Sequence, residues 1–278
     1  MNTIKFIQTF ANPALDNFFI LFTNLGGETL GVIFAIYFLW FKDKRYGYKL
    51  AFGLSFSLLI NNFIKIIVNS PRPIGTKGIR SLAVNTATGT SFPSGHSQGN
   101  AATFTSLFLQ FKTKKVLLIS IIMMILIPIS RLYLGVHWPI DVVCGSIFGI
   151  IAVLISNFIY EQAIKNNIPY LYLILSIILL LSLILFRSSD YIKAIGGFIS
   201  ISLGYYIDTK YIKYNPNSTS KNNVIKLFLG LFGLLIVLSL CSFIIPKGYI
   251  RDFVKYFSLG IWASCIAPLI FMKLKLSN

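Results

Sequence analysis

Acidic residues are scarce in this chain of 278 residues, which has 8 Asp and Glu against 25 Lys and Arg. Histidine and cysteine are rarer still, with two and three residues, and the cysteines lie in apolar runs without paired spacing. Such a composition supplies few ligands for a metal cluster and no disulfide framework. We therefore expect no metal, no other cofactor and three free thiols, at Cys144, Cys241 and Cys265.

Charge of either sign is also rare. Only 12% of the residues are charged and 55% are hydrophobic, and the mean hydropathy is +0.75. The charged fraction is below that of soluble domains, whereas the hydrophobic fraction and the mean hydropathy are above it. These values predict an integral, multi-pass membrane protein without room for a large soluble domain. The net charge of +17 suits anionic lipid headgroups and cytoplasmic loops. We therefore expect the membrane, and not a nucleic acid, as the partner.

Apolar runs between charged or turn-rich breaks predict an all-α bundle of about nine transmembrane helices. A short amphipathic helix at roughly 3–24 precedes them, and Gly26-Gly27 could divide one longer first helix into two. The number of spans is therefore open by one. The expected spans are, roughly, 28–41, 46–68, 96–111, 116–134, 140–160, 168–186, 191–207, 224–245 and 253–272.

The loops differ in positive charge. Most Lys and Arg residues fall in one alternate set of loops, beginning with Lys42, Lys44 and Arg45. Because positive loops stay in the cytoplasm, we expect the amino terminus outside and the carboxy terminus in the cytoplasm. The long loop before His96 then lies on the extracytoplasmic face.

Three polar clusters interrupt the apolar pattern, each at the end of an expected span on that outer side. Taken singly, Lys65 could be a snorkelling residue and Arg131 could pair structurally with Asp141. Together, cations, imidazoles and a carboxylate at one membrane face predict a site for an anion with several oxygens, and phosphate fits best. The clusters are Lys65 with Arg72-Pro73, Pro93-Ser94-Gly95-His96, and Ser130-Arg131 with His137 and Asp141.

The local spacing adds a mechanical hypothesis. Ser94 is well placed to cap the helix that follows it, so free backbone N–H groups and the helix dipole would favour a bound phosphate. Gly95 would let the backbone come close. Pro139 predicts a helix start just after His137, so Asp141 could turn back to one imidazole nitrogen and orient the ring.

The clusters have the form K-x6-R-P, P-S-G-H and S-R-x5-H-x3-D without departures. This pattern resembles the type 2 phosphatidic acid phosphatase superfamily. That superfamily includes lipid phosphate phosphatases, undecaprenyl pyrophosphate phosphatases, sphingosine-1-phosphate phosphatases, glucose-6-phosphatase and soluble vanadium haloperoxidases. The resemblance implies a phosphatase core with six helices in residues 1–160. Residues 161–278 would be additional transmembrane helices, as in the longer sphingosine-1-phosphate phosphatase and glucose-6-phosphatase architecture.

The resemblance also implies roles. His137 would attack phosphorus and form a phosphohistidine, Asp141 would orient it, and His96 would protonate the leaving oxygen and then activate water. No metal is needed in such a scheme, because cations neutralise the developing charge. The implied phosphate ligands are Lys65, Arg72, Ser94, Gly95 and Arg131.

The function implied is metal-independent hydrolysis of a lipid phosphate in the outer leaflet. A polyprenyl diphosphate, phosphatidate, phosphatidylglycerol phosphate or sphingoid phosphate would each suit, and Lys77 and Arg80 could help to attract the headgroup. The alternatives are a lipid phosphotransferase that passes the phosphoryl group to an acceptor, and a non-enzymatic phospholipid-binding or transport protein. The sequence leaves the choice of lipid and the oligomeric state open.

Overall fold

The computed structural model describes residues 2–277, apart from the side chain of Leu25, and its regular structure in that range is entirely helical. The chain forms two compact units. Unit 1 comprises residues 1–32 and 56–155, and unit 2 comprises residues 33–55 and 156–278. All the predicted site residues belong to unit 1.

The amino-terminal segment is two helices rather than the single one predicted at 3–24. Helix α1 (Asn2–Gln8) ends before Asn12, whose side chain caps α2 (Pro13–Leu25) by accepting from the Leu15 N–H at 3.0 Å. A bend of 44° at a short break then separates α2 from the apolar residues 29–42. Gly27 lies in this break with φ +78°, a conformation that glycine adopts without strain.

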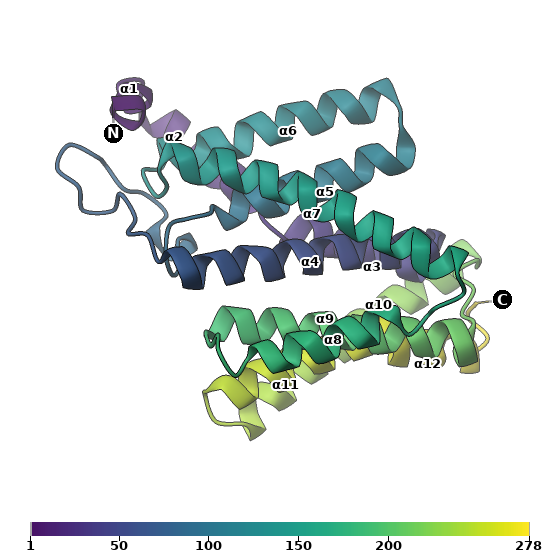
Figure 1. Ribbon diagram of the computed structural model, residues 1–278. Coiled ribbons are helices and arrows are strands. Elements are labelled where there is room, and N and C mark those ends of the chain that lie inside the picture. Colours follow the sequence, from purple (N-terminus) through teal and green to yellow (C-terminus); the bar gives the residue numbers. More distant parts are fainter. Residues whose placement is uncertain (1, 278) are drawn as a thin grey trace. The chain divides into compact units, whose positions relative to one another are not determined.

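Four helices carry the motifs of unit 1: α4 (Lys44–Val68), α5 (Gly95–Phe111), α6 (Lys114–Tyr133) and α7 (Pro139–Lys165). The end of α4, the start of α5, the end of α6 and the start of α7 meet at the end of the unit from which the long loop projects (Figure 1). This arrangement gathers the three clusters at one end of the bundle.

Helix α5 is the polar centre of unit 1. Gln98 on α5 accepts from Asn61 Nδ2 at 2.8 Å and donates to the Ser57 carbonyl at 2.7 Å, so amide side chains join α5 to α4. Helix α7 approaches α5 closely at two glycines. A Cβ on Gly145 would lie 2.7 Å from the backbone carbonyl oxygen of Ser94, and one on Gly149 would lie 2.3 Å from the backbone carbonyl oxygen of Gln98. Small residues therefore bring the second and third clusters together.

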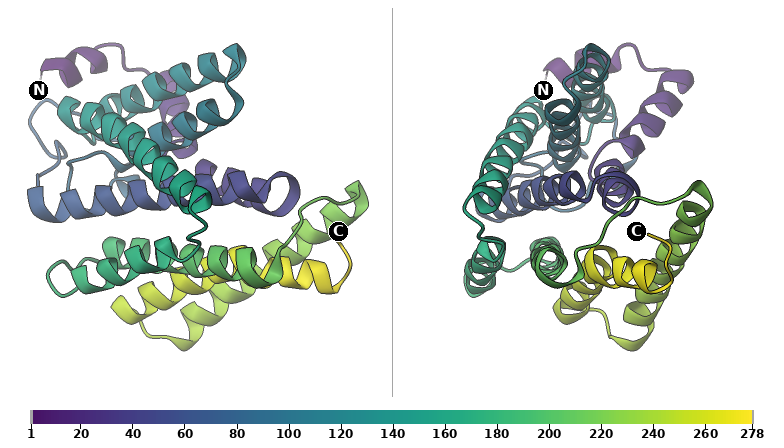
Figure 2. Two further views of the ribbon diagram at one scale, coloured as in Figure 1. Left: turned by 45° about the vertical axis from the view of Figure 1, so that its right-hand side comes forward. Right: turned by 90° about the vertical axis from the view of Figure 1, so that its right-hand side faces the viewer.

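Unit 2 is built from helices, some of which continue into short π-helical segments, at residues 38–42, 208–212 and 262–266. Helix α9 packs along α8 and α11, and the views in Figure 2 show these helices side by side. Its polar interactions gather near residue 40, where Lys226 donates to the carbonyls of Trp40 and Pro216 at 3.0 and 2.9 Å. The helices are α8 (Leu171–Ser182), α9 (Ser189–Ile207), α10 (Ser220–Ile244), α11 (Tyr249–Ile261) and α12 (Ala267–Lys273).

The structure does not confirm nine spans. Five helical segments of the described chain are long and apolar enough to cross a membrane, or six if the bent pair at residues 13–42 is one span. The predicted helices at 96–111, 168–186 and 191–207 exist but are not among these. Helix α5 has 17 residues and many polar ones, α8 has 12 residues, and α9 includes Asp190 and Lys193. The count of nine spans is therefore not confirmed, and the division at about residue 160 stays a prediction.

Candidate active site

The first cluster lies at the end of α4 and in the loop behind it. Lys65 is in the last turn of α4, and its Nζ donates to the Thr90 carbonyl at 2.5 Å. Thr90 Oγ1 in turn donates to the Lys65 carbonyl at 3.3 Å. These two bonds fix the segment just before the second cluster against the helix that carries the first.

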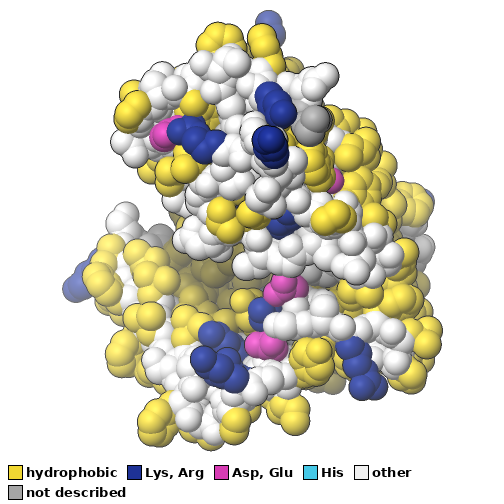
Figure 3. Space-filling model, turned by 90° about the vertical axis from the view of Figure 1, so that its left-hand side faces the viewer, with side chains coloured by type: hydrophobic (Ala, Val, Ile, Leu, Met, Phe, Trp, Pro, Cys, Tyr) yellow, Lys and Arg dark blue, Asp and Glu magenta, His cyan; other side chains and the backbone are white. Residues whose placement is uncertain are grey.

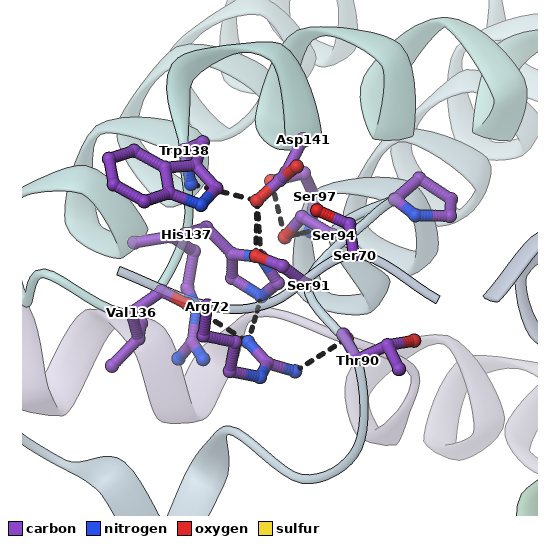
Figure 4. A network of polar contacts seen from close by, with 12 residues as sticks. Ser70, Arg72, Thr90, Ser91, Ser94, Ser97, Val136, His137, Trp138 and Asp141 are labelled. Atoms are coloured by element: carbon purple, nitrogen blue, oxygen red, sulfur yellow. Dashed lines mark hydrogen bonds and ion pairs between the residues drawn. The ribbon is translucent and has the colours of Figure 1, made fainter. Parts of the chain in front are cut away.

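Arg72 donates from all three guanidinium nitrogens to neighbouring acceptors (Figure 4). Nη1 donates to the Val136 carbonyl and to His137 Nε2, both at 2.9 Å. Nε and Nη2 donate to the carbonyls of Thr88, Gly89 and Thr90 at 2.7–3.1 Å. A guanidinium has five N–H donors, so the protein occupies every one.

The second cluster caps α5 as the sequence predicts. Ser94 is the N-cap residue, and its hydroxyl accepts from the Ser97 N–H at 3.4 Å. The Ser94 N–H donates to the Asp141 carbonyl at 3.0 Å, which joins the second and third clusters directly. Gly95 and His96 open the helix, and a Cβ on Gly27 would lie 3.5 Å from the His96 ring. The break between α2 and α3 (Thr29–Tyr37) therefore lies against His96.

The third cluster pairs His137 with Asp141. Helix α7 begins at Pro139, as predicted, and His137 Nδ1 lies 3.3 Å from Asp141 Oδ2. The same carboxylate oxygen accepts from the Trp138 N–H at 2.8 Å and from the Ser91 hydroxyl, which also lies 3.4 Å from His137 Nδ1 (Figure 4). Three donors thus converge on one oxygen and hold the carboxylate beside the imidazole.

The contact with Arg72 defines the tautomer of His137. Because a guanidinium only donates, His137 Nε2 must accept with its lone pair, and the proton of a neutral ring is then on Nδ1, facing Asp141. Burial lowers the pKa of His137 below its usual value, and the Arg72 and Arg131 cations lower it further, against the hydrogen bond with Asp141. The ring is therefore neutral near pH 7, and its electron pair on Nε2 accepts from Arg72.

Arg131 differs from Arg72 in how its donors are used. It is fully buried, and its Nη1 donates to the hydroxyls of Thr23 and Thr86 at 2.7 and 3.0 Å. Nη2 reaches only the Thr86 carbonyl, at 3.5 Å, and Nε has no hydrogen-bond partner. Arg131 also acts electrostatically on His96 and His137, together with Arg72. The edge of its guanidinium formed by Nε and Nη2 thus has only one long hydrogen bond.

The structure therefore places all the predicted site residues at one end of unit 1, and it adds three that the sequence analysis missed. Ser91 lies close to the second cluster in sequence, and this proximity was the one available signal. Thr23 and Thr86 are 108 and 45 residues from Arg131, so no local pattern could reveal them. Arg80 does not offer a free charge, because it forms a bidentate pair with Asp16 at 2.7 and 2.9 Å.

The histidines of the site are largely buried, and the described residues form no group of metal-binding side chains. On the face shown in Figure 3, Lys and Arg side chains are visible whereas neither histidine is, in agreement with the 1% exposure of His137. Within residues 2–277, no three His, Cys, Asp or Glu side chains are grouped so that they could hold a metal ion. The charged groups of the site are chiefly cationic, which suits an anion.

Comparison with known proteins agrees with this geometry. A family model described as the PAP2 superfamily matches residues 46–166, which span all three clusters. A second, described as the transmembrane extension of PAP2 superfamily phosphatases, matches residues 192–278. Together they match most of the chain, so it belongs to the PAP2 superfamily and, within it, to the lipid phosphatases.

Individual relatives are more distant. The chain is 24% identical over 295 residues to a dihydrosphingosine 1-phosphate phosphatase of Schizosaccharomyces pombe, covering 98% of this chain and 69% of the relative. It is 25% identical over 136 residues to an undecaprenyl-diphosphatase of Sulfolobus acidocaldarius, covering 49% of this chain and 66% of the relative. The chain thus spans about two thirds of each relative's length.

A solved structure extends the likeness to the fold. The crystal structure of Aquifex aeolicus LpxE is similar with a TM-score of 0.50 and 28% identity, covering 56% of this chain and 92% of LpxE. The similar part is therefore about half of the present chain, whereas LpxE is matched almost completely.

Proposed function

We propose that this protein hydrolyses a phosphate monoester or diphosphate on a membrane lipid, through a phosphohistidine on His137 and without a metal ion. The observation that carries this proposal is the position of His137 Nε2. Asp141 holds the neutral ring through Nδ1, so that the lone pair of Nε2 faces Arg72, one of the proposed phosphate ligands. A neutral imidazole whose other nitrogen donates to a carboxylate is an activated nucleophile.

The first step is attack of His137 Nε2 on phosphorus. A P–N bond forms as the bond from phosphorus to the lipid oxygen breaks, and His96 gives its proton to that oxygen. The negative charge of the bound phosphate favours the protonated form of His96. In the second step, His96 takes a proton from water, the water oxygen attacks phosphorus, the P–N bond breaks and inorganic phosphate leaves.

Arg72 must change partners before the first step. Its Nη1 lies 2.9 Å from the nucleophilic nitrogen, where phosphorus has to arrive, and all five of its donors are engaged. Phosphate oxygens would therefore replace His137 and some of the carbonyls of residues 88–90 as acceptors. Lys65, Arg131, the Ser94 hydroxyl and the Gly95 N–H would bind the remaining oxygens, so that cations neutralise the transition state.

We propose a lipid substrate in the outer leaflet, with residues 1–160 as the phosphatase core and 161–278 as additional helices. The match over 98% of the chain is to an enzyme named for dihydrosphingosine 1-phosphate, whereas the match to an undecaprenyl-diphosphatase covers 49%. Sphingoid phosphates therefore come first among the substrates to be tried, followed by polyprenyl diphosphate, phosphatidate and phosphatidylglycerol phosphate.

A phosphate-release assay in detergent across these lipids, with EDTA present and His137→Ala as the control, tests the proposal. We expect release from at least one lipid, no effect of EDTA and no release by the variant. Loss of activity in EDTA would overturn the metal-free mechanism. A strict requirement for a second lipid or a sugar would show a phosphotransferase, and full cellular activity of His137→Ala would show a binding or transport protein.

A further inference from the structure

Helix α2 contacts the site through one polar face. Asp16 and Thr23 are seven residues apart, so they lie two turns apart on the same side of α2. Asp16 accepts from the Tyr133 hydroxyl at 2.6 Å and pairs with Arg80, while Thr23 accepts from Arg131 at 2.7 Å. Helix α2 is therefore hydrogen-bonded to two residues at the end of α6, Tyr133 and Arg131, and Arg131 is a predicted phosphate ligand.

The partners of Arg131 are neutral. Thr23 is fully buried, as is Arg131, and no carboxylate pairs with Arg131 within residues 2–277. The hydroxyls of Thr23 and Thr86 occupy both protons of Nη1 without neutralising the charge. A buried arginine with a purely structural role would normally have a charged partner, because desolvation of an unpaired charge is costly. The full positive charge thus remains available for a ligand.

The unoccupied edge has a specific geometry. In a guanidinium, Nε–H and one N–H of Nη2 lie parallel on the same edge and can donate to two oxygens of one phosphate. Nε is buried without a partner, and Nη2 makes only the 3.5 Å contact with Thr86. Because Nη1 is held on the opposite side by two hydroxyls, rotation of the group about its own axis is restricted.

We propose that Thr23 is a positioning residue of the phosphate site, which presents the Nε–Nη2 edge of Arg131 to two phosphate oxygens. This inference rests on the proposed function insofar as the ligand is a phosphate group. It assigns a role in phosphate binding to the first, bent apolar segment, which lies outside the three sequence clusters. Thr86 shares the task from the long loop.

The test compares Thr23→Val with Thr23→Ser in the full-length protein in detergent, using inorganic phosphate as the probe. Valine keeps the shape but removes the acceptor from a charged donor, so we expect the dissociation constant of phosphate, measured by calorimetry, to rise about tenfold or more. The serine variant keeps the hydroxyl and should bind phosphate within about twofold of the wild type. With the best lipid substrate, we expect kcat/KM to fall by the same factor in Thr23→Val and to stay within about twofold of the wild type in Thr23→Ser.

Thr103→Val is the matched control. Thr103 is equally buried, and its hydroxyl donates to the Gly99 carbonyl within α5. We expect this variant to lose as much thermal stability as Thr23→Val and to keep its phosphate affinity. Equal weakening of phosphate binding by both valine variants, or normal binding by Thr23→Val, would overturn the inference.

The outcome separates this inference from the proposed function. If the wild type binds phosphate but releases none from any lipid, the proposed hydrolysis fails, and a weakened Thr23→Val still supports the positioning role. If Thr23→Val does not fold, Asp16→Asn, which loosens α2 from Tyr133 and Arg80, should raise the phosphate dissociation constant in the same direction. Unchanged affinity in Asp16→Asn would then count against the inference.

Discussion

The two units of the chain treat buried charge differently. In unit 1, Arg131 and Asp141 are almost fully buried, and each has a charged atom without a hydrogen-bond partner, Nε and Oδ1. In unit 2, Lys226 is fully buried and donates to two carbonyls and the Tyr214 hydroxyl, and Asp208 pairs with Lys44 at 2.9 Å and accepts from the Tyr214 N–H at 2.8 Å.

This difference distinguishes a site from a structural element. Three donor protons and three acceptors satisfy Lys226 completely, so its charge holds residues 40, 214 and 216 together and has no capacity for a ligand. An unpartnered atom on a buried charge is rare in proteins, and at Arg131 Nε an oxygen of a bound phosphate would supply the missing acceptor. Unit 1 would gain from a bound phosphate, and unit 2 would not.

Replacement of Arg131 by methionine should give the largest effect on activity. The variant removes a clamp cation whose buried Nε has no partner, so we expect kcat/KM to fall about 100-fold to 1000-fold. Thermal stability should stay the same or rise, because an incompletely satisfied charge is replaced by an apolar side chain of similar length. Steady-state kinetics and a thermal unfolding scan in detergent measure both quantities. A large loss of stability without loss of activity would contradict the comparison.

Replacement of Lys226 by methionine should have the opposite signature. The Pro216 carbonyl and the Tyr214 hydroxyl lose their donor, which we expect to lower the free energy of unfolding by about 2 kcal/mol while kcat stays unchanged. The matched control is Lys221→Met, in the first turn of the same helix but exposed, which should change neither. A fall in kcat of the folded Lys226→Met protein would show that unit 2 contributes to the site.

The protonation of His137 offers a third comparison. Its pKa is held down by burial and by Arg72 and Arg131, so the ring should stay neutral below the usual imidazole value of about 6.5. The chain has two histidines, so His96→Gln leaves one imidazole for a nitrogen NMR titration. The unfolded chain binds the proton more readily, and this histidine therefore makes stability fall as the pH drops below about 6.5. A midpoint at or above 6.5 would contradict the described environment.

Loss of an exposed ion pair should have the smallest effect on stability and activity. Arg45 pairs with Glu161 at 2.9 Å, but the two side chains are 60% and 47% exposed. Because such pairs contribute little, we expect Arg45→Gln to change the free energy of unfolding by at most about 0.5 kcal/mol, with no effect on kcat. The thermal midpoint of the purified variant, compared at low and high salt, measures this. A loss as large as that of Lys226→Met would remove the distinction between buried and exposed charge.

The sequence predicts where individual helices begin better than it predicts the number of spans. Caps and helix starts depend on local chemistry, so Ser94 and Pro139 could be placed from their neighbours alone. The number of spans depends on which apolar runs face lipid. Helix α5 is an example, since its Gln98 and Ser97 are buried against other helices and make it too polar for a typical span.

Contacts between distant segments could not be predicted. Thr23 and Arg131 meet because α2 packs on α6, and no residue near either one indicates this. The engagement of Arg72 with the carbonyls of residues 88–90 depends on the path of the long loop, which has no periodic pattern. Both features determine how Arg72 and Arg131 lie in the site, although the sequence alone is enough to propose these two residues as phosphate ligands.

The phosphoenzyme is the most direct test of the mechanism. Rapid acid-free quenching of the protein with a lipid labelled in its phosphate, followed by detection of label on the polypeptide, measures it. The account predicts a labelled protein in which the label is stable in base and labile in acid, as a P–N bond is, and no label on His137→Ala. Turnover without any labelled intermediate, or a label retained by His137→Ala, would contradict covalent catalysis by His137.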